Sequence, residues 1–248
     1  MPKIAIIGGS GLENPEILKQ PQRITLKTPY GDPSSDFICG TIGGVEVVLL
    51  SRHGREHTIP PTQVNNRANL YAIKQLECTH ILATTACGSL RENIGRGDLV
   101  IPDQFIDFTR HRKVTFFEAF EPHVMKHTPM ADPFNDNLRE KLISAGEGLG
   151  LTIHPKGCIL TIEGPRFSTR AESHMFRAWG GDMINMSTAP ECMLANELGI
   201  PYAAVAMATD FDSWKEDEAP VSWEEILKVF GHNVHNVVNI LLKVIPEI

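Results

Sequence analysis

Short runs of apolar, often β-branched residues alternate along the chain with longer segments in which apolar residues recur every three to four positions. Several of the short runs are hydrophobic throughout, which is typical of strands buried on both faces of a sheet. The clearest predicted strands are Lys3–Ile7, Val45–Leu50, His80–Thr84, Asp98–Ile101, Cys158–Ile162, Met183–Asn185 and Tyr202–Ala208. The helical periodicity predicts helices over Val64–Leu76, Asn137–Leu149, Arg170–Trp179, Pro190–Leu198 and Trp223–Val244.

Three of the predicted helices begin with the pattern of a capping box, in which a hydroxyl and a glutamate bind each other's backbone amides. The three patterns are Thr169-x-x-Glu172, Thr188-x-x-Glu191 and Ser222-x-x-Glu225. The alternation of strands and helices predicts an α/β fold with a mixed or mostly parallel central sheet flanked by helices. No repeat or linker interrupts it, so we predict a single domain over residues 1–248.

Composition narrows the classes of function. The 248 residues carry a net charge of −7, and 42% are hydrophobic, as in a folded globular protein. There is no surplus of Lys and Arg for nucleic acid, and no apolar run has the length of a signal peptide or membrane span. We therefore expect a cytoplasmic protein with no nucleic-acid or membrane partner. Five scattered cysteines without CxxC spacing predict reduced thiols rather than a disulfide framework or zinc ribbon.

Small and polar residues gather directly after the predicted strands. Ligands of open α/β sheets bind outside the carboxyl ends of the strands, so these clusters can surround one small-molecule site. The clusters are Gly8-Gly9-Ser10-Gly11, Ser51-Arg52-His53, Thr84-Thr85-Ala86, Glu163-Gly164-Pro165-Arg166-Phe167, Asn185-Met186-Ser187-Thr188 and Thr209-Asp210-Phe211-Asp212.

Some of these clusters have chemistry suited to an anion. The glycine turn around Ser10 exposes backbone amides, although it matches neither the dinucleotide fingerprint nor a P-loop and can also be a tight connection. Arg52 carries a permanent charge and a fork that fits phosphate, unless it belongs to a solvated surface pair. Thr85 follows a strand and can serve as a donor or as an ordinary strand former. Ser187 precedes a helix N-terminus, which attracts anions, or it only caps that helix.

The segment from His53 to His57 matches the H-x-x-E-H pattern of zinc peptidases. That pattern binds metal on a helix, where both imidazoles share one face. Gly54 and the following Ile59-Pro60-Pro61 oppose a helix here, so we predict no metal site.

Asp210 and Asp212 stand two positions apart at the end of the last predicted strand. Residues at i and i+2 of a strand point to the same side, so both carboxylates can face one space. Two carboxylates held together raise the pKa of one of them and so produce a proton donor. A solvated acidic loop is the alternative interpretation.

Taken in order, the six clusters resemble the methylthioadenosine-cleaving members of the trimeric branch of the purine nucleoside phosphorylase family. The resemblance covers nearly the whole chain and includes Thr84-Thr85-Ala86-Cys87-Gly88-Ser89. It implies a transferase of purine and methionine salvage, in which phosphate reversibly converts S-methyl-5′-thioadenosine to adenine and 5-methylthioribose 1-phosphate. It also implies a homotrimer, alone or paired into a hexamer. No metal or organic cofactor is expected, because phosphate is a co-substrate.

The resemblance also implies roles for individual residues. Phosphate would be bound by Ser10, Arg52, His53, Thr85, the Ala86 amide and Ser187. The nucleoside would be bound by Phe167 on the base, Met186 on the ribose, Asp210, Phe211 and Asp212, with the two aspartates as the catalytic pair. Specificity would depend on Ser168, Trp223 and a neighbouring subunit's His127. Apart from the resemblance, the apolar residues Val221, Trp223 and Leu227 at the start of the last predicted helix can form the wall of an apolar pocket for the 5′ substituent. The chain departs from the pattern at Ser187, where relatives often carry Thr, and at Trp223, which is bulkier than the aliphatic residue of some relatives.

Three alternatives stay open at this point. A phosphorylase for 6-oxopurines such as methylthioinosine or inosine would tend to carry Asn in place of Asp210. A nucleosidase would use water and leave Arg52 without an anion to hold. A non-catalytic nucleotide-binding module would cleave nothing. Phosphate-dependent release of free adenine separates all three from the expected activity.

Overall fold

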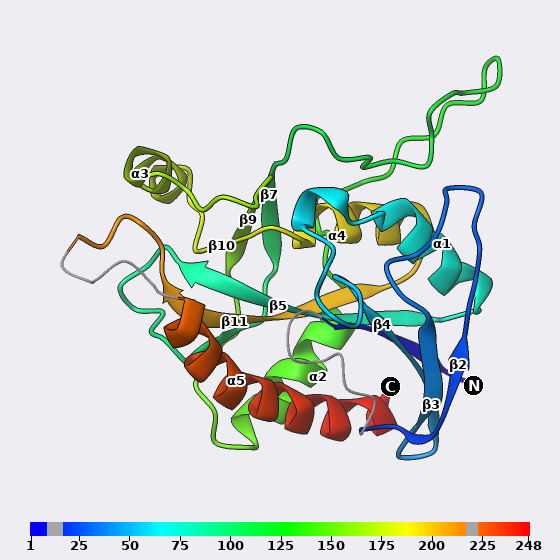
Figure 1. The fold of residues 1–248 in the computed structure, drawn as a ribbon, viewed down its shortest axis with the longest axis horizontal. Helices are drawn as coiled ribbons and strands as arrows, with labels where there is room; N and C mark the ends of the chain where they lie inside the picture. Colours follow the sequence, from blue (N-terminus) through cyan, green and yellow to red (C-terminus); the bar gives the residue numbers. More distant parts are fainter. Residues whose placement is uncertain (9–16, 217–222) are drawn as a thin grey trace.

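A mixed sheet runs through the computed structural model, which describes residues 1–8, 17–216 and 223–248 (Figure 1). Within these ranges its strands are β1 (Lys3–Gly8), β2 (Lys19–Ile24), β3 (Phe37–Ile42), β4 (Val45–Ser51), β5 (His80–Ser89), β6 (Leu99–Val100), β7 (Gln104–Phe108), β8 (Ile153–His154), β9 (Cys158–Ile162), β10 (Met183–Asn185) and β11 (Tyr202–Phe211). One path through the sheet has the order β2-β3-β4-β1-β5-β10-β9-β7, and β11 pairs with β5. The α/β fold with a mixed central sheet is as predicted.

Helices cover both faces of this sheet. They are α1 (Asn66–Gln75), α2 (Asp136–Glu147), α3 (Arg170–Ala178), α4 (Thr188–Glu197) and α5 (Trp223–Val244). Figure 1 shows α2 and α5 on one side of the sheet and α1 and α4 on the other.

Alternation along β1 explains why two separate cores form. Ile4 and Ile6 pack with residues of α2 and α5, while Ala5 and Ile7 pack with residues of α1 and α4. Because successive strand residues point to opposite faces, a continuous apolar run serves both cores at once. The central strands β1, β4, β5 and β11 run parallel, so their carboxyl ends share one edge of the sheet.

The predicted helices and strands all occur, with shifted ends, and four strands were not predicted. β2 is exposed and contains Pro21, which only an edge strand tolerates. β7 lies at the opposite edge and exposes Gln104 and Asp107. β3 includes Gly40 and half-buried Cys39, and β8 has two residues only. The edge strands β2 and β7 expose polar residues, so they lack the continuous apolar runs on which the prediction depended. β3 lies between β2 and β4, but Gly40 and Thr41 interrupt its apolar run.

The capping-box predictions had different outcomes. The reciprocal bonds between Thr169 and Glu172 at the start of α3 are present, as predicted. The prediction for Thr188 and Glu191 was wrong, because Thr188 is already the first residue of α4 and Glu191 binds Arg52. Ser222 lies outside the described residues.

Two central strands continue further than predicted, and this decides where the site residues lie. β5 extends to Ser89 and β11 to Phe211, so Thr85 and Asp210 lie within strands rather than after them. The register of this strand pair shifts between Ala208 and Asp210, which leaves Thr209 as an inserted residue. Such a bulge bends the strand and re-aims the side chains that follow it.

The segment between β7 and α2 leaves the body as a long irregular arm (Figure 1). Its base is anchored, because Glu197 accepts hydrogen bonds from Thr115 Oγ1 (2.6 Å) and from the Phe116 amide (2.7 Å). Towards its tip it exposes three apolar side chains, Phe120, Val124 and Met125, which are 46%, 53% and 73% exposed. These three residues are called the arm tip below.

All five cysteines are unbridged, as predicted, and Cys78, Cys87 and Cys192 are buried. In the ranges that the structure describes, there is no helix with the length and apolar character needed to cross a membrane.

Candidate active site

A cavity of about 580 Å³ opens at the edge where the central strands end. Residues from five of the six predicted clusters line it, and most of the sixth lies outside the described residues. The predicted site residues in its lining are Arg52, His53, Thr85, Ala86, Phe167, Ser168, Met186, Ser187, Asp210 and Asp212. The prediction that these polar clusters surround one pocket is therefore confirmed for them.

Other predicted site residues lie elsewhere. The Phe211 ring does not appear among the lining residues and instead packs edge-on against Trp214, with Lys215 Nζ 3.9 Å from its centre. His127 lies on the arm, against Phe120. Ser10 and Val221 lie outside the described residues, as do the side chains of Trp223 and Leu227 at the start of α5.

One end of the cavity is built around Arg52, whose side chain is only 2% exposed. Its Nε and Nη2 donate to the two carboxylate oxygens of Glu191, the latter over 3.0 Å, and its Nη1 donates to the Thr84 carbonyl oxygen at 2.9 Å. Burial alone would lower the pKa of Arg52, but Glu191 more than offsets this and holds the pKa above its ordinary value. Arg52 is therefore charged and held in one orientation, and the carboxylate of Glu191 balances its charge.

His53 lies beside this ion pair as a neutral ring. Its Nδ1 is 2.8 Å from the Ile59 carbonyl oxygen, which can only accept, so Nδ1 carries the proton. Burial and then the Arg52 charge lower the pKa of His53 to about 4. Near pH 7 its Nε2 is consequently a hydrogen-bond acceptor.

The segment from His53 to His57 forms turns rather than a helix, as predicted, with the two rings 4.7 Å apart. Among the described residues, no group of three or more His, Cys, Asp or Glu side chains is placed to hold a metal ion.

Hydroxyl groups complete this end of the cavity, which is called the phosphate end below. Thr85 Oγ1 and Ser187 Oγ are 3.1 Å apart, and both residues are buried. Ser187 makes no side-chain cap on α4, so its hydroxyl is not used by the helix. The prediction that Ser187 has a role besides capping is thereby supported.

A second part of the lining, called the base end below, contains the two aspartates. A β-carbon placed on Gly88 would lie 3.4 Å from Asp212 Cβ and 3.5 Å from Asp210 Oδ2, so both side chains approach the same point. Both residues line the same cavity, as predicted. The tightest contact of such a β-carbon would be with Ile184 Cγ2 at 3.0 Å, so a side chain at Gly88 would require Ile184 to shift.

Each aspartate of the base end also has a hydroxyl partner. Ser168 Oγ donates to Asp212 Oδ2, and Thr209 Oγ1 lies 2.6 Å from Asp210 Oδ1. Thr209 is the inserted residue of the bulge, so the irregularity of β11 brings this hydroxyl to Asp210. Cys87 also lines the cavity, but burial raises the pKa of its thiol to about 12, so it is not a thiolate nucleophile.

Phe167 and Met186 also line the cavity, and contacts with neighbouring residues position them. Gly164 has φ +69°, and a β-carbon there would collide with Met186 Sδ at 2.4 Å. Arg112 is 3% exposed, and its Nη1 donates to the Met186 carbonyl oxygen while its Nε contacts Glu163 Oε1 at 3.2 Å. These contacts fix the backbone at Met186.

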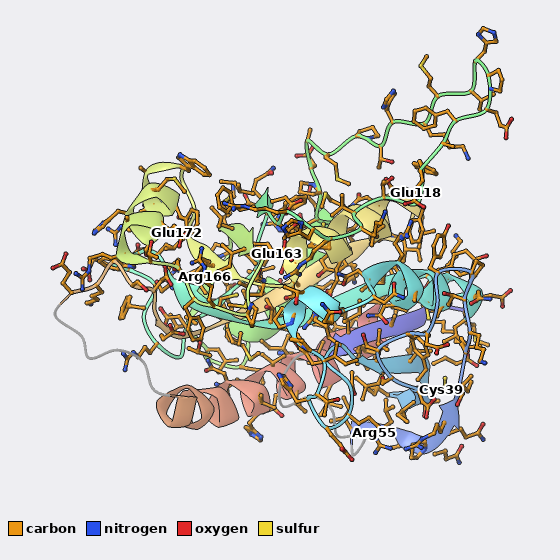
Figure 2. The ribbon with its side chains drawn as sticks, turned by 45° about the horizontal axis from the view of Figure 1, so that its top comes forward. Cys39, Arg55, Glu118, Glu163, Arg166 and Glu172 are labelled. Carbon is orange, nitrogen blue, oxygen red and sulfur yellow. The ribbon has the colours of Figure 1, made fainter. Side chains whose placement is uncertain are left out.

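The loop that carries Phe167 is held from the α3 side. Arg166 donates to both carboxylate oxygens of Glu172 at 2.7 Å, and Figure 2 shows these two residues together beside α3. Glu163 lies deeper in the body in the same view. Phe167 itself is 61% exposed at the cavity mouth, where an entering flat ring can cover it.

Sequence reasoning missed several residues of this site. Glu191 was assigned to a helix cap, whereas it is the partner of Arg52. Asn185, Thr209 and Arg112 received no role. For Arg112 the sequence offers no signal, because its partners lie 50 or more residues away. The signal that could have assigned Glu191 to the site was its position one helical turn after Ser187.

Comparison with known proteins agrees with this architecture. Residues 3–246 match the model of the phosphorylase superfamily, and the chain belongs to that family. S-methyl-5′-thioadenosine phosphorylase of Danio rerio is 53% identical over 99% of this chain and 89% of its own length. The enzyme of the same name from Xenopus tropicalis is 54% identical, with the same coverage of both chains.

Solved structures show the same fold. Methylthioadenosine phosphorylase from Schistosoma mansoni in complex with adenine superposes with a TM-score of 0.92 and 42% identity, over 99% of this chain and 91% of that one. A substituted form of the adenosine/methylthioadenosine phosphorylase of the same organism, in complex with methylthioadenosine, has a TM-score of 0.91, 41% identity and the same coverage.

Proposed function

We propose that this chain catalyses the phosphorolysis of S-methyl-5′-thioadenosine to adenine and 5-methylthioribose 1-phosphate. The relatives named above carry that activity in their names at about half identity over nearly the full chain. The observation that carries the proposal is one cavity whose lining combines two sets of groups. A cationic side chain and hydroxyl donors form one set, two carboxyl groups form the other, and a methionine and an aromatic ring belong to the same lining.

The phosphate end suits an anionic nucleophile. Arg52, Thr85, Ser187 and the Ala86 amide donate to the phosphate, and neutral His53 accepts from its hydroxyl group. As the bond from C1′ to N9 breaks, the sugar gains positive charge that the bound phosphate stabilises. A phosphate oxygen then forms the new bond to C1′. Donors fixed in advance by partners such as Glu191 need little reorganisation at that moment, which is where such sites gain most of their rate.

The base end suits a departing adenine. The base gathers negative charge as it leaves, and a proton from Asp210 to N7 neutralises it. Asp212 is oriented by Ser168 and accepts from the 6-amino group. Proton transfer of this kind typically contributes about 10²–10⁴-fold to the rate. A 6-oxopurine would place its 6-oxo oxygen, which is an acceptor, against the Asp212 carboxylate, which is also an acceptor. The two aspartates therefore favour adenine over its 6-oxo counterpart.

The reaction, as we propose it, uses no metal or organic cofactor, since phosphate is the nucleophile and side chains handle the proton. Five free thiols favour a reducing compartment, and we propose the cytoplasm.

We further propose that the active assembly is a homotrimer. The arm tip carries three exposed apolar side chains beyond the body of the subunit, and such groups usually become buried in an interface. With the arm docked on a second copy, His127 would reach the part of that copy's cavity that holds the sugar. A monomer would then have an incomplete site.

The direct experiment supplies S-methyl-5′-thioadenosine with and without phosphate and follows free adenine and the sugar product. Adenine release that requires phosphate, with one sugar 1-phosphate per adenine, is expected. Equal release without phosphate would make the protein a nucleosidase, and release only from methylthioinosine would make it a 6-oxopurine phosphorylase. No release from any nucleoside would leave a binding module.

A further inference from the structure

Asn185 lines the cavity beside the hydroxyl groups of the phosphate end and is itself 5% exposed. Its Oδ1 accepts from Thr161 Oγ1 at 2.8 Å and from the Ser187 amide at 3.4 Å. Its Nδ2 donates to Thr85 Oγ1 at 3.0 Å and to Thr188 Oγ1 at 2.6 Å. The side-chain amide thus uses both hydrogens and both lone pairs of its oxygen.

The partners of Asn185 fix which way its amide points. The Ser187 amide can only donate, so it requires the oxygen of Asn185. Thr161 Oγ1 accepts from the Ala189 amide at 3.1 Å, and its single proton is therefore free to donate to the same oxygen. A flipped amide would place two hydrogens against these donors, at the cost of buried unsatisfied groups. The nitrogen of Asn185 must consequently face Thr85.

This orientation determines the direction of the Thr85 hydroxyl. Thr85 Oγ1 accepts a hydrogen bond from Asn185, so its own single proton is directed away from that amide, towards Ser187 Oγ, the Ala86 carbonyl oxygen at 3.3 Å or an anion in the cavity. Such direction matters here because Glu191 balances the Arg52 charge and His53 is neutral. The anion therefore depends strongly on neutral donors whose protons already point at it.

We propose that Asn185 is a positioning residue for phosphate, which fixes the Thr85 hydroxyl as a donor towards the anion. The proposal rests on the phosphorolysis proposed above, whose site it deepens. It makes Asn185 specific to phosphate binding rather than to the nucleoside, because its partners lie at the phosphate end.

The test replaces Asn185 by Asp, which keeps the shape but turns a donor into an acceptor. In Asn185→Asp the Thr85 hydroxyl donates to the new carboxylate instead. The phosphate therefore loses this hydrogen-bond donor. Loss of one donor to an anion predicts a rise in KM for phosphate of about 10- to 100-fold at pH 8. The KM for S-methyl-5′-thioadenosine, measured at saturating phosphate, is expected to change less than three-fold, by the same physical argument.

A pH series separates this role from general damage to the fold. Protonation gives the new carboxyl group an O–H that can donate to Thr85 again. The ratio of phosphate KM in Asn185→Asp to that of the parent at the same pH should therefore fall as the pH is lowered from 8 to 5. A ratio that stays constant with pH would overturn the proposal.

The matched control is Thr188→Val, which removes the other acceptor of the same amide without touching Thr85. Its phosphate KM is expected to stay near that of the parent. An equal rise in phosphate KM in both variants would show that loss of any hydrogen bond of Asn185 has the same effect. That result would overturn the proposal.

A second pair of variants decides the matter if Asn185→Asp does not fold. Thr161→Val removes the donor that holds the Asn185 oxygen, while Thr161→Ser keeps it. Phosphate KM is expected to rise in the valine variant and to return towards the parent value in the serine variant. Identical phosphate KM values for the two would overturn the proposal. A parent that releases adenine without phosphate would refute the proposed function itself.

Discussion

Arg52 and Glu191 face each other edge to edge in the cavity wall, with Nη2 of one 3.0 Å from Oε2 of the other and each side chain almost completely buried. Tyr202 lies behind them, and its hydroxyl donates to the same carboxylate at 3.1 Å. The cation proposed to bind phosphate is thus held by a residue of α4, the helix whose N-terminus follows Ser187. One ion pair links the fold of the subunit to its proposed binding of phosphate.

Removing Glu191 alone should destabilise the protein more than removing Arg52 and Glu191 together. Glu191→Leu leaves a buried, unpaired Arg52 charge, and the free energy of unfolding should fall by about 3–5 kcal/mol. The double variant Arg52→Met/Glu191→Leu should recover at least half of that loss. Denaturant unfolding measures both.

Phosphate binding should respond differently to the same two variants. The double variant lacks the guanidinium, so its KM for phosphate should stay far above that of the parent even though stability returns. A double variant as unstable as the single one would contradict the assignment of Glu191 as the charge partner of Arg52.

His53 should make stability depend on pH. The pKa of His53 is about 4 in the folded protein and about 6.5 in an unfolded chain, so below pH 6.5 the unfolded state binds more protons. The contribution of neutral His53 is therefore present above pH 6.5 and is lost progressively between pH 6.5 and 4. The difference between these two pH values amounts to about 3 kcal/mol.

His53→Gln, in which the side chain can still donate to the Ile59 carbonyl oxygen, is the variant that isolates this effect. Its unfolding free energy should change less between pH 6.5 and 4 than that of the parent, measured without phosphate. Parallel curves for the two proteins would show that His53 is not held neutral.

The arm tip should control assembly. Light scattering at assay concentration is expected to give a trimer or a multiple of three. Val124→Glu combined with Met125→Glu places charges in the proposed interface, so it should yield smaller particles and reduced adenine release. Leu149→Glu is the control, because Leu149 is 41% exposed on the body at the end of α2. Full activity in a monomeric arm-tip variant would exclude a contribution from a neighbouring subunit.

Much of this site could be predicted from the sequence because its residues follow or end strong strand patterns. Asp210 and Asp212 were assigned to one space from the alternation of a strand, and both side chains approach the same point beside Gly88. The bulge at Thr209 could not be predicted, because it depends on the register between β11 and β5. The positions of the two aspartates after this bulge still match the prediction, since both line the cavity.

Other features depend on tertiary contacts that no local pattern contains. Glu191 fits a capping box by its spacing from Thr188, and the local interpretation was reasonable. Arg52, which lies 139 residues away, takes that carboxylate instead, because a buried guanidinium needs an opposite charge. The start of α4 is then stabilised from outside by Thr161, whose hydroxyl oxygen accepts from the Ala189 amide. Long-range charge pairing therefore overrode the local signal.

The claim at the centre of this account is that Asp210 protonates a departing adenine, and one substitution tests it most directly. Asp210→Asn keeps the shape of the side chain and supplies an amide donor, but it has no proton to transfer. With phosphate saturating, kcat on S-methyl-5′-thioadenosine should fall by about 10²–10⁴-fold, while relative activity on methylthioinosine should be retained or gained. Asp132→Asn, on an exposed loop before α2, should match the parent on both substrates. If Asp210→Asn cleaves S-methyl-5′-thioadenosine at the parent rate, Asp210 neither protonates nor recognises the base, and the assignment of adenine to this end of the cavity is contradicted.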